Sequence, residues 1–176
     1  LYGEDPESDF LPTAGPVLLF ERSRVADARY DSGIESGSNV GIEFEPMLAK
    51  VIVHAPTRTE ASLRLARVLE TTRVQGLVTN RDFLVNVLRD DAFLDGDTTT
   101  DFIERINPQR GRAPEWGVII ESCIAAAMVA QCERRANAGV LRLVRSGWRN
   151  SVMPPELVEY TAGEEEDLCR AIERIA

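Results

Sequence analysis

Alternating apolar and polar residues predict a strand over residues 40–45. Its apolar members fall at every second position, which is the period of a strand with one buried face; they are Val40, Ile42 and Phe44. The following run, 47–53, is apolar except for Lys50, which is typical of a more deeply buried strand. Together these two runs predict the centre of a sheet.

Two further strands are expected earlier in the chain. Residues 16–21 and 24–31 each carry spaced apolar positions and flank a tight turn at residues 22–23, so they are interpreted as a hairpin. The inward-facing candidates of this hairpin are Val17, Leu19, Val25 and Tyr30.

Helical spacing takes over from residue 58. Residues 58–72 place Ala61, Leu65, Val68 and Leu69 on one face, and Thr57 and Glu60 have the spacing of a capping box. Residues 79–82 and 98–101 are polar starts of two shorter helices, which carry Phe83, Leu84, Val87 and Leu88, and Phe102, Ile103 and Ile106. Strands followed by helices predict an α+β fold, with an antiparallel sheet that has its helices packed on one face.

Residues 107–113 are rich in Pro, Gly, Arg and Gln, which predicts a linker between a domain over residues 1–106 and a second region over residues 114–176. The second region opens with a long apolar helix over about residues 114–136, which Gly139 ends. A partial β segment of one or two strands is expected next, at 141–144 and 148–150. The acidic start of residues 164–176 predicts a helical tail.

Apolar residues cover nearly every direction around the long helix, so something must enclose it. Between Trp116 and Cys132 the apolar run is interrupted by Gly117, Glu121, Ser122 and Gln131. We interpret this run as too short and too interrupted for a membrane span, which needs about 20 residues.

The composition narrows the functional classes. The 176 residues carry a formal net charge of −9, which argues against unaided binding to nucleic acid or to an anionic membrane surface. The three cysteines, Cys123, Cys132 and Cys169, lack metal-binding spacing, and the chain has one histidine, His54. Free thiols in a reducing compartment, and hence a cytoplasmic protein, are expected.

Several motifs occur in one order along residues 1–105. They are Arg29-x-Asp31-Ser32-Gly33-Ile34-x-x-Gly37, Glu45-Pro46-Met47-x-x-Lys50-x-Ile52, Arg58-x-x-Ala61, Gly76-x-x-Thr79-Asn80-x-x-Phe83-Leu84 and Phe93-x-x-Gly96-x-x-x-Thr100-x-Phe102-Ile103-Glu104. This series resembles the C-terminal domain of biotin carboxylase. Residues 114–176 more loosely resemble the start of the connecting domain of propionyl-CoA-type carboxylases, in which a barrel wraps a long helix.

The resemblance implies a parent polypeptide that uses ATP, Mg²⁺ and bicarbonate to carboxylate biotin. In that family the nucleotide and metal ligands, and an arginine that acts on biotin, precede the position of Leu1. No cofactor is therefore expected to bind this chain alone. The implied partners are the ATP-grasp segment of the same enzyme, a biotin carrier domain and a carboxyltransferase subunit, in an oligomeric assembly without nucleic acid or membrane.

Three residues align with family sites. Glu45 stands where the family has an aspartate near the biotin-directed arginine, and the alternative is a solvated acid at a strand end. Thr100 aligns with a residue that touches adenine, and the alternative is a plain helix start. Arg29 aligns with an arginine of the homodimer interface, and the alternative is an internal ion pair with Asp31 or Glu35. His54 is interpreted as structural because no nucleophile accompanies it.

The expected function is thus part of a ligase, the biotin carboxylase of an acyl-CoA (propionyl-CoA-like) carboxylase α subunit in fatty acid metabolism, inactive as this chain alone. One alternative is a non-catalytic module that only ties carboxylase subunits together. Another is an unrelated α+β binding module, which the ordered motifs disfavour.

Overall fold

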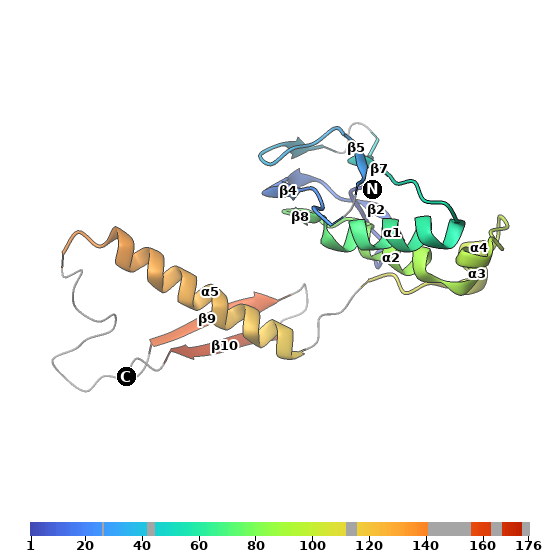
Figure 1. The fold of residues 1–176 in the computed structure, drawn as a ribbon. Helices are drawn as coiled ribbons and strands as arrows, with labels where there is room; N and C mark the ends of the chain where they lie inside the picture. Colours follow the sequence, from blue (N-terminus) through green and yellow to red (C-terminus); the bar gives the residue numbers. More distant parts are fainter. Residues whose placement is uncertain (26, 42–44, 112–115, 141–155, 163–166, 174–176) are drawn as a thin grey trace. The chain divides into compact units, whose positions relative to one another are not determined.

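The computed structural model describes residues 1–25, 27–41, 45–111, 116–140, 156–162 and 167–173 (Figure 1). The chain divides into two compact units, Leu1–Arg112 and Ala113–Ala176, and each is described by itself.

The described residues of the first unit form four antiparallel strand pairs. They are β1 (Glu4–Asp5) with β2 (Leu11–Pro12), β3 (Gly15–Pro16) with β6 (Asn39–Val40), β4 (Leu19–Glu21) with β8 (Arg73–Gln75), and β5 (Arg29–Ser32) with β7 (Ala49–Ile52). The α+β class and the antiparallel pairing are therefore confirmed. The strand predicted over 47–53 is also confirmed as β7, whereas residues 42–44 of the strand predicted over 40–45 lie outside the described residues.

The predicted hairpin of residues 16–21 and 24–31 is wrong. β4 pairs with β8, which follows the first long helix, and β5 pairs with β7. Strand periodicity predicts which face is buried but not which strand is the partner. Val17 is fully buried, as predicted, whereas the predicted inward residue Val25 is 54% exposed.

The helices of the first unit are α1 (Arg58–Thr71), α2 (Arg81–Arg89), α3 (Asp91–Asp95) and α4 (Phe102–Ile106). The predicted cap of α1 is confirmed, because the Thr57 hydroxyl accepts a hydrogen bond from the Glu60 amide at 3.2 Å. The sequence analysis missed α3, which Asp90 caps at its start and Gly96 ends in the left-handed conformation.

One apolar cluster holds α1 to α2, and a second holds α2 to α4. Ala66 and Leu69 of α1 pack with Val85 and Leu88 of α2, and Phe83, Val87 and Phe102 form the second cluster. The buried residues of α1 are Ser62, Ala66, Val68 and Leu69. Val68 and Leu69 are thus buried as predicted, whereas the predicted Ala61 and Leu65 are only partly buried. In Figure 1 these two helices lie side by side against the strands of the first unit.

The second unit contains α5 (Trp116–Asn137), β9 (Glu156–Ala162) and β10 (Asp167–Glu173). The two strands pair antiparallel along their whole length, so the predicted helical tail over 164–176 is wrong. The acidic run favours a helix start only locally, and pairing with β9 outweighs that preference. The strands predicted at 141–144 and 148–150 lie outside the described residues.

The helix predicted over 114–136 is confirmed as α5. Its length, however, contradicts our interpretation that the apolar run is too short to span a membrane. At 22 residues, α5 is long and apolar enough to cross a membrane by length and composition. The helix continues five residues past the apolar run that we counted. One such helix is weak evidence, because core helices of soluble proteins pass the same test. Its buried positions in the described structure are Cys123 and Ala127.

Candidate functional site

Arg29 lies on β5 and forms a two-pronged ion pair with Asp31 of the same strand. Its Nε donates to Asp31 Oδ1 at 2.9 Å and its Nη2 to Oδ2 at 2.8 Å. The hydrogen bonds from Arg29 lower the pKa of Asp31, which Lys50 on the neighbouring strand lowers further. Both side chains are exposed. The structure thus forms the internal pair that the sequence left open, and it leaves one face of the guanidinium accessible to a partner.

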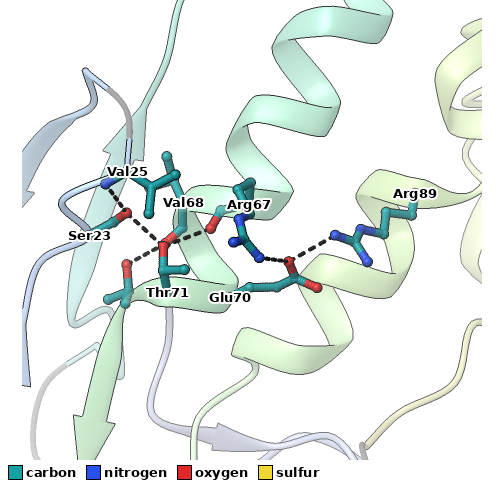
Figure 2. Close-up of polar contacts among 8 residues, drawn as sticks. Ser23, Val25, Arg67, Val68, Glu70, Thr71 and Arg89 are labelled. Atoms are coloured by element: carbon teal, nitrogen blue, oxygen red, sulfur yellow. Dashed lines mark hydrogen bonds and ion pairs between the residues drawn. The ribbon is translucent and has the colours of Figure 1, made fainter.

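Hydroxyl groups anchor this part of the chain to the end of α1. The Tyr30 and Thr72 hydroxyls lie 2.6 Å apart, and those of Ser23 and Thr71 lie 2.7 Å apart. Figure 2 shows the second pair, with Thr71 at the end of α1 and the Val25 amide donating to the Ser23 hydroxyl. This network was not predicted from the sequence. The two threonines at the end of α1, Thr71 and Thr72, were its only local signal, because hydroxyl side chains there can bond to neighbouring groups.

Glu45 is exposed and immediately precedes a segment that pairs with the first residues of the chain. The Gly3 amide donates to the Pro46 carbonyl at 2.8 Å, and Tyr2 and Met47 form an antiparallel bridge. The backbone that follows Glu45 is therefore held by the first residues of the chain, while Glu45 itself is exposed.

Thr100 lies in an exposed turn two residues before α4. Its neighbour Thr99 donates a hydrogen bond to Asp101, and this bond is the main cause of the lowered pKa of the Asp101 carboxyl. The turn fits the helix-start interpretation.

The three predicted residues lie on different segments, and no contact in the described structure joins them. Among the same residues, no group of three His, Cys, Asp or Glu side chains could hold a metal ion. His54 contributes its carbonyl oxygen, which accepts a hydrogen bond from Arg64 at 2.9 Å. The described residues therefore do not form a complete catalytic site.

Arg110 makes a further contact that the sequence analysis missed. Its Nη1 donates to the Pro6 carbonyl at 3.1 Å and to Asp9 at 3.3 Å, and its guanidinium lies 5.4 Å from the centroid of the Phe10 ring. Asp9 and Phe10 both have positive φ angles, which such residues adopt only where neighbours hold them. The predicted linker is therefore clamped to the first unit through residue 110, and no periodic pattern signals such a contact.

Comparison with known proteins decides the family. The model of the biotin carboxylase C-terminal domain matches residues 1–105, more than half of the chain. The chain belongs to this family. The resemblance deduced from the ordered motifs is thereby confirmed.

Curated relatives include carboxylases with several substrates. The chain is 40% identical over 122 residues to a biotin-dependent acyl-coenzyme A carboxylase alpha3 subunit from Mycobacterium leprae, covering 69% of this chain and 20% of that protein. It is 36% identical over 105 residues to biotin carboxylase 2 from Bacillus subtilis, covering 60% and 23%. The human propionyl-CoA carboxylase alpha chain is 34% identical over 110 residues, covering 61% and 15%. The chain thus spans a quarter or less of these relatives.

Solved structures agree with this family assignment. The biotin carboxylase domain of Hydrogenobacter thermophilus 2-oxoglutarate carboxylase, in complex with MgADP and bicarbonate, matches with a TM-score of 0.58 at 28% identity, over 60% of this chain and 23% of that one. A Rhizobium etli pyruvate carboxylase with acetyl coenzyme A matches with a TM-score of 0.60 at 30% identity, over 65% and 11%.

Exchanging Arg29 for glutamate tests whether its exposed face meets a second subunit. Arg29→Glu should weaken self-association of the protein and leave the melting temperature nearly unchanged, because an exposed ion pair adds little to stability. Analytical ultracentrifugation and thermal melting give the two readouts. Unchanged sedimentation with a lowered melting temperature would instead restrict Arg29 to its pair with Asp31.

Proposed function

We propose that this chain is the C-terminal part of the biotin carboxylase of a biotin-dependent acyl-CoA carboxylase, a cytoplasmic ligase that carboxylates carrier-bound biotin with ATP and bicarbonate. The observation that carries the proposal is the family match over residues 1–105. Relatives of this family act in multidomain carboxylases, and one solved relative binds MgADP and bicarbonate. The partners proposed here are the preceding ATP-grasp segment, a biotin carrier domain and a carboxyltransferase subunit.

The role assigned to this chain is one wall of the active site. Leu1 lies beside β7, where its amino group donates to the Ala49 carbonyl at 2.8 Å, and Glu45 immediately precedes the segment, residues 46 and 47, that pairs with residues 2 and 3. Among the described residues, no group of three His, Cys, Asp or Glu side chains could hold a metal ion, and no chemical step is assigned to them.

The purified 176-residue chain should neither hydrolyse ATP nor carboxylate free biotin, whereas the full-length parent should do both in a bicarbonate-dependent manner. Phosphoryl transfer requires cations and metal ligands clustered around the phosphates, and the part of the chain that the structure describes contains no group of side chains that could hold a metal ion. Phosphate release with and without bicarbonate and biotin measures this. Bicarbonate-dependent ATP hydrolysis by the chain alone would contradict the proposal that the catalytic residues lie in other parts of the parent. A parent that does not hydrolyse ATP would favour the non-catalytic assembly module.

The acyl-CoA assignment rests on a finer observation. The alignment with the alpha3 subunit runs over 122 residues at 40% identity, whereas those with urea amidolyase and pyruvate carboxylase run over 103 and 102 residues at 36% and 34%. The assembled parent should therefore carboxylate propionyl-CoA or another acyl-CoA rather than pyruvate or urea. Radiolabelled bicarbonate fixation with each acceptor distinguishes these substrates, and fixation only with pyruvate or urea would overturn the assignment.

A further inference from the structure

A polar cleft lies along α2 beside the end of α1, away from the residues used in the proposed function. Its volume is about 250 Å³. The side chains that line it are Glu70, Arg81, Asp82, Asn86, Arg89 and Gln109, with the apolar Val85. Four ionic side chains and two amide side chains therefore line one small cleft.

At the Arg89 end of the cleft, one carboxylate is shared by two guanidinium groups, of which Arg89 lines the cleft and Arg67 lies beside it. Figure 2 shows the Glu70 carboxylate between two guanidinium groups, with its Oε2 2.8 Å from Arg89 and 3.6 Å from Arg67. One carboxylate therefore balances two cations in a chain whose net charge is −9. Arg89 uses Nη2 for Glu70, and the guanidinium has further N–H donors in its planar fork. This end is suited to an oxyanion.

The other end of the cleft is polar but electrically balanced. Arg81 donates to Asp82 at 2.8 Å and to the Thr72 carbonyl at 3.1 Å. Between the ends, the Asn86 amide nitrogen donates to the Gln109 backbone carbonyl at 2.8 Å, so the Asn86 side-chain oxygen can still accept a hydrogen bond. Carboxylate and amide oxygens are acceptors for hydroxyl groups.

Residues beyond the family domain form the third wall of the cleft. Gln109 is held there by Asn86, and its neighbour Arg110 is fixed to Pro6 and the Phe10 ring. The cleft is thus closed by a segment that lies outside residues 1–105, and its geometry is preorganised without a ligand.

We propose that this cleft binds a small polyol phosphate, with the phosphate at Arg89 and the hydroxyl groups at Asp82, Asn86 and Gln109. Arg81 and Arg89 are eight residues apart on α2, or about 12 Å along the helix axis, so an elongated ligand is accommodated better than a bare ion. The anion adds to the group of Arg67, Glu70 and Arg89, which carries one net positive charge, and the hydroxyl groups donate to the remaining acceptor oxygens of the cleft.

Three probes test both halves of the site on the 176-residue chain. Inorganic phosphate carries only the anion, glycerol carries only the hydroxyl groups, and glycerol 3-phosphate carries both. Titrations followed by NMR should give saturable binding of glycerol 3-phosphate, about tenfold or more tighter than either other probe, with amide shifts at Asn86, Arg89 and Gln109. Equal affinity for inorganic phosphate and glycerol 3-phosphate would indicate an adventitious ion only and would overturn the proposal, as would no binding.

Arginine variants separate a built site from general charge. Arg89→Gln should weaken glycerol 3-phosphate binding by about tenfold or more, because a hydrogen bond to a charged group is lost. Arg67→Gln, which leaves Glu70 balanced by Arg89 alone, should weaken it less. Arg105→Gln is the matched control, since Arg105 also pairs with carboxylates, Asp97 and Asp101, but lies outside the cleft.

Two results complete the test. Gln109→Ala should reduce the affinity for glycerol 3-phosphate and leave that for inorganic phosphate unchanged. Equal loss in the Arg105 and Arg89 variants, with melting temperatures unchanged, would overturn the proposal. All measurements are binding experiments on the chain itself, so their outcome is independent of whether the parent is an acyl-CoA carboxylase.

Discussion

Gly76→Ala should destabilise the first unit by about 4 kcal/mol, a large part of the total stability of a domain. Gly76 has a φ of +108°, and a Cβ added there would lie 2.0 Å from the Pro16 carbonyl oxygen and 2.8 Å from the Leu18 amide nitrogen. Both groups belong to backbone that is fixed beside β8, since the Leu18 amide donates to the Gln75 carbonyl. Relief therefore requires the β4–β8 ladder to move.

Urea denaturation of the first unit measures this loss, and Gly33→Ala is the matched control. A Cβ at Gly33 would meet only the Leu48 carbonyl, at an ordinary 3.8 Å, so the control should change the free energy of unfolding by less than about 1 kcal/mol. Equal urea midpoints for the two variants would contradict this prediction and show that the backbone near Pro16 moves at little cost in free energy.

Deleting residues 113–176 should abolish both the binding of a hydrophobic dye and the self-association of the chain. Large apolar side chains of α5 are exposed around the helix: Trp116, Val118, Ile120, Ile124, Met128 and Val129. Covering each would gain about 1.5–3 kcal/mol, so a second copy or a further part of the parent should bury them. The deletion begins at 113 because Arg110 and Gln109 are bound to the first unit.

Dye fluorescence and light scattering of the intact and shortened chains give the answer. In the intact chain, Ile124→Glu and Met128→Glu should each lower both signals, whereas Ser122→Glu adds the same charge at an exposed polar position and should not. An intact chain that is a monomer and does not bind the dye would refute this expectation.

The local spacing of apolar residues was sufficient to predict most of the helices. The spacing of apolar residues predicted α1, α2, α4 and α5 within a few residues of their ends, and the Thr57 cap was recognised from two residues. Helix hydrogen bonds join residues four apart, so the information lies in one short window of sequence. The family could be recognised for a related reason, since ordered motifs are a property of the sequence itself.

Strand pairing was decided by the tertiary structure. β4 pairs with β8 more than fifty residues later, and β10 pairs with β9 although its own residues favour a helix start. An antiparallel ladder needs a partner at a distance that periodicity does not encode. The sequence therefore predicted that residues 16–21 form a strand but assigned the wrong partner.

The same distinction applies to the candidate sites. The sequence, through its motifs, singled out Arg29, Glu45 and Thr100, and by itself determined the family and the helical half of the fold. Only the tertiary structure brought Tyr30 to Thr72, Arg110 to Phe10 and Glu70 to Arg89. These contacts join residues 19 to 100 positions apart, and their geometry depends on how whole elements pack rather than on any local pattern.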